Sequence, residues 1–536
     1  MLAGTELAGS TLAGVAAAIL FGGSYTFWSQ SIIAEVYALH IAFVALTLLC
    51  ALRWAERPTR SRLAWFFATY ALGFGNHLSM ILLAPGFAVF LLLSAPGGWR
   101  ALLGPRVVAL AATIAMAGAL QYTWNLKGLW MADHPPSGLV DAVQTFWFDV
   151  TKSDWRETMV LDVPGSLVRE RVAMYGFDVL QQFGWAVLLA PIGLIHLLRV
   201  NPRAAALMFG LYAVCVLFAF GYNVGDAHVF YLPSHAIVAL LAAPGLVAIA
   251  RARPRAVAAV CALGVLYGAV RIYRDYPALD RSADRRPAEV MTRLTGGVDE
   301  EHAVLIADLN WQLVNGLAYF TKVVRPDVPF AWLREVLLYL PALTRDNVAA
   351  GRELVLTPRA RELVAQAYGP LLPIDNEPAA SPSLAAAVAN LPPGTRYVLC
   401  VLRPTPDFVL DREDLAKAVD LLTGRSTPIP DGDYVAIAGV VSAPPTVAQA
   451  SARPFRESVQ IEGIDVQVRM ESWLTFDTIR RMGFGQVIAA RRHTLIVERG
   501  VSFVAFDGHG VPIRTGYSAN IFAPQPRYRI RRLNLE

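Results

Sequence analysis

A series of long apolar runs fills the first half of this chain and ends near Tyr273, and no other feature constrains the fold as strongly. A membrane-spanning helix needs about 20 mostly apolar residues, because the hydrocarbon core of a bilayer is about 30 Å thick. The candidate spans, about nine in number, are residues 7–27, 31–53, 62–76, 77–95, 105–124, 175–198, 204–222, 229–250 and 255–273. We therefore predict a multi-pass α-helical membrane bundle over residues 1–273.

The third and fourth candidate spans are the weakest. They meet at Asn76–His77, which is a poor sequence for a turn. A single helix followed by a re-entrant segment is the alternative for residues 62–95.

Arginines predict the orientation of the spans, because cytoplasmic loops carry an excess of Lys and Arg. Four loops carry clusters of arginine: Arg53, Arg57, Arg60 and Arg62; Arg100 and Arg106; Arg199 and Arg203; and Arg251, Arg253 and Arg255. These loops alternate along the chain, so one topology satisfies all of them. It places the N-terminus in the cytoplasm and residues 274–536 outside, which in a bacterial inner membrane is the periplasm.

Polar residues gather at the predicted outer ends of the spans, although intramembrane polar groups are costly. Four clusters are present: Trp28, Ser29, Gln30 and Ser31 with Glu35, Tyr37 and His40; Asn76 and His77; Asp133, His134, Trp147, Asp149 and Asp154; and Tyr222, Asn223, Asp226, His228 and Tyr231. Because all four clusters lie at the outer ends of the predicted spans, we predict that they line one polar cavity that opens outward.

Glu35 is the strongest functional candidate of these residues. Ser31, Glu35, Ala38, Ala42 and Ala45 share one face if residues 31–53 form a continuous helix. Small residues favour close helix packing, so this pattern predicts that Glu35 points into the bundle.

For the other polar residues a structural interpretation stays open. His40 and Asn76 could each make an interhelical hydrogen bond, Asp226 and His228 could be solvated, and Trp28 could lie in an interfacial aromatic belt.

The second half of the chain has the pattern of a water-soluble region. A polar connector covers 274–300, alternating strand-like and helix-like runs predict an α/β domain over 301–442, and residues 443–536 are β-rich. Asp308 follows the first predicted strand, where open α/β sheets place ligand contacts; an N-cap of the next helix is the alternative. No P-loop, GxGxxG, GxSxG or HExxH motif occurs.

Charge and cysteine content argue against several classes of function. The net charge of +5 is accounted for by loop arginines and gives no indication of nucleic-acid binding. The four cysteines form no CxxC pair, and three lie in predicted spans, so neither a disulfide framework nor a zinc site is expected.

The segment from Phe27 to His40, with its Glu35-Val36-Tyr37 core, resembles a signature of one membrane family. Further pieces fit the same family: Gly73 to His77, Phe148 to Thr151, Tyr222 to Asp226, Asp275 to Pro277, and Arg325 to Val328. This is the domain-of-unknown-function family that includes the transmembrane O-mannosyltransferase-like proteins, which are similar to GT-C-type glycosyltransferases. The resemblance covers about residues 7–330.

The resemblance implies a GT-C-like bundle that transfers a sugar, such as mannose, from a polyprenyl-phosphate donor to a protein or glycan acceptor at the outer membrane face, without a metal or other cofactor. Such chemistry needs a carboxylate base and groups that stabilise the phosphate leaving group. The catalytic candidates are Glu35, Asp226 and His77. The substrate-binding candidates are Trp28, Gln30, Tyr37, His40, Asn76, Asn223 and His228.

Family members carry an acidic first outer loop with a Gly-Asp-Ser-Gly-Glu-like motif, and this chain contains no such motif. The expectation is that the chain begins near the family's third helix and lacks the first two helices. Three alternatives stay open: a chain inactive as given, a transporter or flippase, and a non-catalytic scaffold with a periplasmic binding domain.

Overall fold

The computed structural model divides the chain into two compact units. One comprises Met1–Leu279 with Leu474–Arg480, and the other comprises Asp280–Trp473 with Arg481–Glu536. The structure describes residues 1–33, 35–131, 135–151, 160, 165–222, 227–250, 253–280, 282, 285–376, 383–402, 411–452, 455–475, 480–490, 493–497, 500–518 and 526–535.

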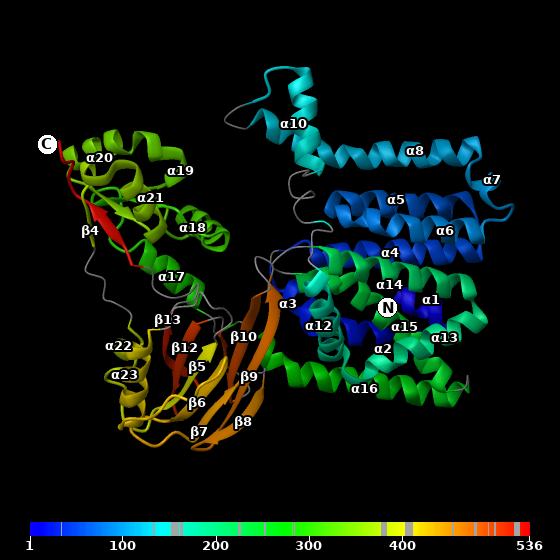
Figure 1. Ribbon diagram of the computed structural model, residues 1–536. Coiled ribbons are helices and arrows are strands. Elements are labelled where there is room, and N and C mark those ends of the chain that lie inside the picture. Colours follow the sequence, from blue (N-terminus) through cyan, green and yellow to red (C-terminus); the bar gives the residue numbers. More distant parts are fainter. Residues whose placement is uncertain are drawn as a thin grey trace. The chain divides into compact units, whose positions relative to one another are not determined.

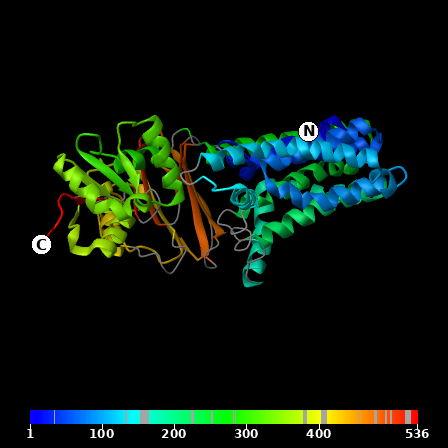
Figure 2. The ribbon, with the colours of Figure 1, turned by 90° about the horizontal axis from the view of Figure 1, so that it is seen from above.

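The first unit is a helical bundle whose long helices run along one common direction (Figures 1 and 2). Its helices are α1 (Leu2–Ala8), α2 (Thr11–Gly22), α3 (Tyr25–Ser31), α4 (Tyr37–Glu56), α5 (Arg60–Asn76), α6 (Ala84–Ser94), α7 (Trp99–Leu102), α8 (Pro105–Ala119), α9 (Thr123–Trp130), α10 (Leu139–Thr151), α12 (Gly165–Phe183), α13 (Leu189–Val200), α14 (Pro202–Gly221), α15 (Leu232–Ile249) and α16 (Pro254–Leu279). Short 3₁₀ turns join some of them: η1 (Leu78–Leu83), η2 (Leu120–Tyr122), η3 (Gly184–Leu188) and η4 (Ala227–Tyr231).

Six helices in the described part of the chain are long and apolar enough to cross a membrane. They are Tyr37–Glu56, Pro105–Trp130, Asp178–Val200, Pro202–Gly221, His228–Ile249 and Pro254–Tyr276. A seventh span results if α2 and α3, which meet at a 71° bend, are counted together. The predicted class, a multi-pass helical membrane protein followed by a strand-containing region, is confirmed, and the chain is an integral membrane protein.

Within the described residues, fewer helices qualify as spans than the nine expected, because two of the predicted runs form short helices. Residues 62–76 lie in α5, which has 17 residues, and residues 77–95 begin as the 3₁₀ turn η1 before α6. The apolar run 7–27 is likewise divided, since α2 ends at Gly22 and α3 turns away from it. Hydropathy reports which residues avoid water, and it does not report where the backbone bends.

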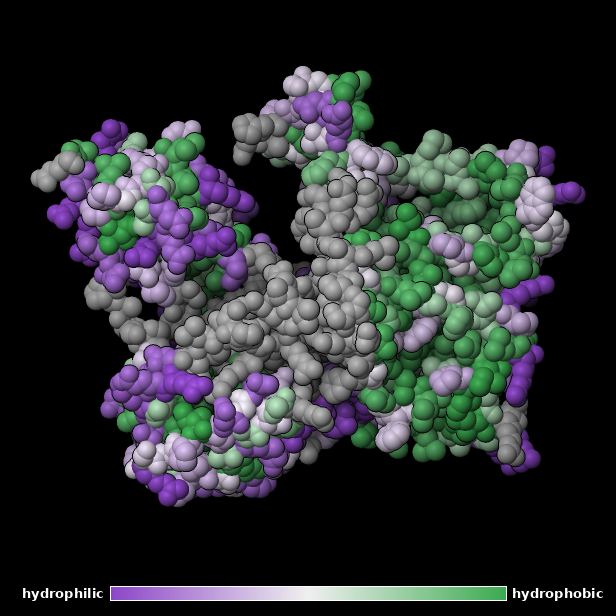
Figure 3. Space-filling view, viewed as in Figure 1, coloured by the Kyte–Doolittle hydropathy of each residue, from purple (hydrophilic) through white to green (hydrophobic). Residues whose placement is uncertain are grey.

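The bundle core is formed around α4, α14 and α15. α15 is the most enclosed of the six spans, since 72% of its apolar window is buried, whereas no residue in the apolar window of the span Pro105–Trp130 is buried. Two of the helices that follow arginine-bearing turns are capped by a side chain at their N-terminus. Thr59, just before α5, accepts a hydrogen bond from the Arg62 amide, and Asn201, just before α14, accepts one from the Ala204 amide. Figure 3 shows apolar atoms covering the sides of the bundle and hydrophilic atoms at the end that carries α7.

The second unit contains three sheets, with strand orders β2-β1-β3-β14-β4, β11-β10-β9-β8 and β13-β12-β5-β6-β7. Its strands are β1 (Ala303–Ala307), β2 (Phe330–Trp332), β3 (Glu353–Leu356), β4 (Ile374–Asn376), β5 (Arg396–Leu402), β6 (Tyr434–Val440), β7 (Val447–Ser451), β8 (Arg456–Ile461), β9 (Ile464–Thr475), β10 (Arg480–Ala489), β11 (His493–Val497), β12 (Gly500–Phe506), β13 (Pro512–Ser518) and β14 (Tyr528–Ile530). Its longer helices are α17 (Arg286–Leu294), α18 (Trp311–Val323), α20 (Leu340–Ala349), α21 (Pro358–Tyr368) and α23 (Arg412–Thr423), and its shorter ones are α19 (Leu333–Val336) and α22 (Leu384–Val388).

The boundary expected at residues 442/443 does not separate two sheets. β5 pairs with β12, and β14 inserts between β3 and β4 of the first sheet. Both pairings join segments about 100 or more residues apart. A local pattern identifies a strand but cannot identify its distant partner, so the division of this region required the tertiary structure.

Candidate functional site

Glu35 lies between two helices. α3 ends at Ser31 and α4 begins at Tyr37, and Glu35 is exposed in the break between them. The predicted face that ran through Glu35, Ala38 and Ala42 is therefore wrong, since it assumed a continuous helix. The break leaves the carboxylate outside the packed interior, which avoids the cost of burying it.

Next to this break, two histidines from distant segments of the chain are joined by hydrogen bonds to one serine, Ser79. His40 lies in the first turn of α4 and is buried, and its Nε2 is 3.1 Å from the Ser79 hydroxyl. The same hydroxyl is 2.7 Å from Nδ1 of His77, which also accepts a hydrogen bond from the Ser79 amide. Nδ1 of His77 is thus the acceptor, so the Ser79 hydroxyl donates to His77 and accepts from His40. Asn76 donates to the Val36 carbonyl at 3.2 Å and holds the end of α5 against the start of α4.

A small cavity adjoins this group of side chains. Its volume is about 20 Å³, enough for about one water molecule. Tyr37, His40 and His77 line it together with Phe230 from η4. The ring centroids of His40 and His77 are 4.8 Å apart, and those of Tyr37 and His77 are 5.9 Å apart. Three sequence candidates from two distant segments therefore do lie together.

The remaining candidates are less closely grouped. Trp28 and Gln30 are half-buried on α3, and the Trp28 ring is 6.0 Å from the ring of Tyr276. His228 is half-buried in η4. Asn223 and Asp226 lie outside the described residues, so the proposed closeness of Glu35 and Asp226 stays a prediction.

The outer-loop cluster is only partly described. Asp133, His134 and Asp154 lie outside the described residues. Trp147 and Asp149 belong to α10, where Trp147 is exposed and the Asp149 carboxylate accepts a hydrogen bond of 2.8 Å from Asn125.

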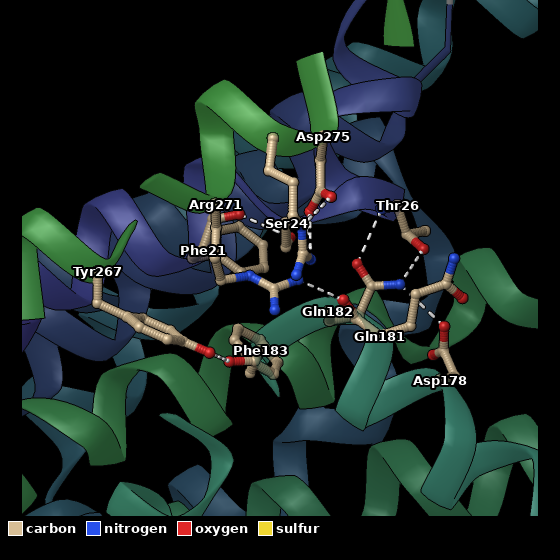
Figure 4. A network of polar contacts seen from close by, with 11 residues as sticks. Phe21, Ser24, Thr26, Asp178, Gln181, Gln182, Phe183, Tyr267, Arg271 and Asp275 are labelled. Atoms are coloured by element: carbon tan, nitrogen blue, oxygen red, sulfur yellow. Dashed lines mark hydrogen bonds and ion pairs between the residues drawn. The ribbon is translucent and has the colours of Figure 1, made fainter. Parts of the chain in front are cut away.

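A second polar network, which the sequence analysis did not single out, is buried among α3, α12 and α15. The Asp178 carboxylate lies 3.0 Å from Nε2 of His235, and the two side chains are 6% and 0% exposed. Gln182 donates to the other oxygen of Asp178 at 2.9 Å and to the Thr26 hydroxyl at 2.7 Å, and its carbonyl accepts from the Thr26 amide (Figure 4). This network fixes the start of α3 and thereby the chain that leads to Glu35.

Helical spacing could have revealed this network. Arg171, Tyr175, Asp178 and Gln182 follow i, i+4, i+7, i+11 spacing on α12 and therefore share one face. Arg171 donates to the Phe220 carbonyl at 2.5 Å and to the Tyr222 carbonyl at 3.1 Å, which closes the end of α14. Four polar side chains on one face of a membrane helix are a stronger indication than any one of them alone.

The far end of α16 also joins this region. Arg271 donates to the Gln181 carbonyl at 2.5 Å and lies 3.4 Å from Asp275, while the Tyr267 hydroxyl donates to the Phe183 carbonyl at 2.9 Å (Figure 4). These contacts connect α16 with the junction of α12 and η3.

The turn η4 connects the two groups of polar side chains. Phe230 contacts the rings of Tyr37 and His77, and its neighbour Tyr231 packs 4.8 Å from Tyr175. Tyr175 in turn stacks on His235 at 5.9 Å. A movement of η4 would therefore displace side chains in both the His40–Ser79–His77 group and the Asp178 network.

Asp308 has a structural partner in the second unit. Its carboxylate lies 3.2 Å from the Arg359 guanidinium, and its amide donates to the Thr357 hydroxyl at 3.0 Å. The N-cap of α18 is Asn310, which accepts a hydrogen bond from the Leu313 amide. Asp308 is therefore not the helix cap that the sequence allowed. In the described part of the chain, no group of three or more His, Cys, Asp or Glu side chains is placed to hold a metal ion.

Comparison with known proteins shows that the segment containing Glu35 is similar to one described family of membrane proteins. Residues 3–97 match the family model described as "Protein O-mannosyl-transferase TMEM260 N-terminal domain". No curated protein matches the chain. Among solved structures, the chain is similar to the crystal structure of ArnT from Cupriavidus metallidurans bound to undecaprenyl phosphate, with 13% identity, a TM-score of 0.41, and coverage of 70% of this chain and 80% of that one. The resemblance to O-mannosyltransferase-like membrane proteins is thus confirmed for residues 3–97, which include Glu35, His40, His77 and Ser79.

Proposed function

We propose that this protein is a GT-C-type glycosyltransferase that moves a sugar from a polyprenyl-phosphate donor to an acceptor at the extracytoplasmic face. One observation carries the proposal. An exposed carboxylate, Glu35, lies at a helix break directly before the hydrogen-bonded chain His40–Ser79–His77, inside the segment that matches an O-mannosyltransferase domain.

The chemistry assigns a role to each of these groups. The acceptor hydroxyl attacks the anomeric carbon, the bond from that carbon to the phosphate oxygen breaks, and Glu35 takes the hydroxyl proton as general base. Because Nδ1 of His77 accepts from Ser79, its Nε2 carries a hydrogen and can donate to the departing phosphate. Trp28, Gln30, Tyr37 and Asn76 are the proposed sugar-binding residues. Asn223, Asp226 and His228 remain proposed members of the site.

An apolar cavity supports the lipid-linked nature of the donor. It has a volume of about 390 Å³ and lies among α12, α13, α14 and α15, with Tyr175, Val179, Leu194, Phe209 and Leu241 in its lining. The Tyr175 hydroxyl lies 3.2 Å from the Ser234 hydroxyl. A hydrocarbon chain fits such a lining, whereas a free sugar nucleotide does not.

The test is sugar transfer by the full chain in liposomes that contain polyprenyl-phosphate mannose, with an added hydroxyl-bearing peptide as acceptor, read as release of polyprenyl phosphate. Glu35→Gln should lower the rate by roughly 100-fold or more, the usual contribution of a general base. Glu56→Gln is the matched control, because Glu56 is an exposed carboxylate at the opposite end of α4. Equal rates for Glu35→Gln and the parent would remove Glu35 from the mechanism, and no transfer by the parent would contradict this donor.

Transport is the second candidate, and the buried Asp178–His235 contact is the observation that favours it, since buried ionisable pairs also mark proton paths. Lipid translocation in the same liposomes without sugar transfer, abolished by Asp178→Asn, would support it.

A further inference from the structure

Helix α10 has two chemically opposite faces. Leu139, Val143 and Trp147 follow i, i+4, i+8 spacing and are 81%, 59% and 67% exposed. Val140, on the same side, is 72% exposed. Polar residues occupy the opposite side with the same spacing: Asp141, Thr145 and Asp149. Large apolar side chains at this level of exposure need a partner if they are not to face water.

Hydrogen bonds fix the polar face. Asp141 accepts from the amide and the hydroxyl of Ser137, at 2.8 and 3.0 Å, which orders the start of the helix. Near its end, Asp149 accepts from Asn125 of α9 at 2.8 Å. The helix is therefore held by its polar side, and the apolar side is left outward.

The axis of α10 has the direction expected of a helix that lies in the plane of a bilayer surface. It lies across the common direction of the long helices, at one end of the bundle, in both Figure 1 and Figure 2. Figure 3 shows apolar atoms on the side of α10 turned toward the level of the spans and hydrophilic atoms on the opposite side. The span that leads to it ends in Trp124 and Trp130, which are 75% and 58% exposed, and tryptophans at span ends mark the membrane–water interface.

We propose that α10 is an interfacial helix that binds the bilayer surface, with Leu139, Val140, Val143 and Trp147 inserted at the boundary between headgroups and acyl chains. Helices with one apolar face and one polar face take this position. α10 carries two carboxylates and no basic residue. Its binding therefore comes from apolar burial, and a zwitterionic phosphatidylcholine surface is sufficient. This proposal does not depend on the proposed sugar-transfer function.

The experiment places a nitroxide label on each face of α10 in the full chain, reconstituted in phosphatidylcholine nanodiscs. Val143→Cys reports the apolar face, and Thr145→Cys, two residues away and also exposed, is the matched control. Cys50 is half-buried and the other native cysteines are buried, so the unsubstituted chain, treated in parallel, supplies the background. Collisions with oxygen, which enters lipid, are compared with collisions with a water-soluble nickel complex.

We expect a higher oxygen-to-nickel collision ratio at position 143 than at position 145, unchanged when phosphatidylglycerol is added. Equal ratios at the two positions, with both labels open to nickel, would overturn the proposal. The proposal would also be overturned if neither oxygen nor the nickel complex reached the label at position 143, because protein would then cover the apolar face of α10. So would a high ratio that appears only with phosphatidylglycerol, since attraction to anionic lipid would then replace apolar burial.

Discussion

At the scale of single residues, the cost of burial explains where this protein keeps its charges. Glu35 stays exposed at a helix break, whereas Asp178 is buried and makes contacts with both His235 and Gln182. A buried carboxylate without partners would shift toward its neutral form or destabilise the fold. The imidazole and the amide therefore account for the presence of Asp178 in the interior.

Replacement of Asp178 should reveal this dependence. We expect Asp178→Asn to lower the free energy of unfolding by about 1–3 kcal/mol, because Nε2 of His235 loses the carboxylate oxygen that lies 3.0 Å from it. Thermal unfolding in detergent measures the effect, with Glu56→Gln as the control. The double variant with His235→Phe should be non-additive, and additivity within about 0.5 kcal/mol would show that the two side chains do not interact.

At the scale of elements, glycines decide how closely two spans approach. A Cβ atom placed on Gly193 of α13 would lie 1.9 Å from the Leu241 carbonyl oxygen, and one on Gly245 of α15 would lie 2.2 Å from the Leu189 carbonyl oxygen. The two helices therefore meet backbone to backbone, and small residues at such crossings permit packing without a hydrophobic driving force. This crossing also forms part of the wall of the apolar cavity that contains Leu241.

Alanine at the crossing should force the helices apart. We predict that Gly193→Ala lowers the free energy of unfolding by about 1–3 kcal/mol, the usual cost of overpacking. Gly210→Ala is the control, because nothing lies within 4 Å of a Cβ atom placed on Gly210 in α14. Alanine loses less backbone entropy on folding than glycine does, so this variant should be more stable than the parent by about 0.5–1 kcal/mol. Equal melting temperatures for the two variants would contradict the backbone contact.

At the scale of the whole molecule, the arginine-bearing turns between spans and the buried polar clusters occupy opposite ends of the bundle. The arginine-bearing turns lie between α4 and α5, around α7, between α13 and α14, and before α16, at one end in Figure 1. The His40–Ser79–His77 chain and the Asp178 network lie at the other end, near α3. This separation is what the positive-inside rule requires if the polar end faces outward.

Reporter fusions test this topology. Fusions after residues 100 and 200 should report a cytoplasmic location, and a fusion after residue 300 should report an extracytoplasmic one, because the arginine loops hold their end inside. An enzyme pair active on opposite sides of the membrane gives a signal at every position. A cytoplasmic signal at residue 300 would invert the orientation and, with it, the face on which sugar transfer is proposed.

The sequence by itself determined the features that depend on neighbouring residues. Apolar length predicted membrane helices, arginine placement predicted which ends lie together, and short apolar runs predicted strands within residues 301–442, where β5 (Arg396–Leu402) is one of those observed. Each of these follows from local hydrophobicity, charge or periodicity.

Tertiary structure alone decided how distant segments meet. The exposure of Glu35 and the insertion of β14 beside β3 were not encoded in any local pattern. The Asp178–His235 contact joins residues from two helices. A buried polar group must find its partner wherever packing places one, and that choice is made by the whole fold.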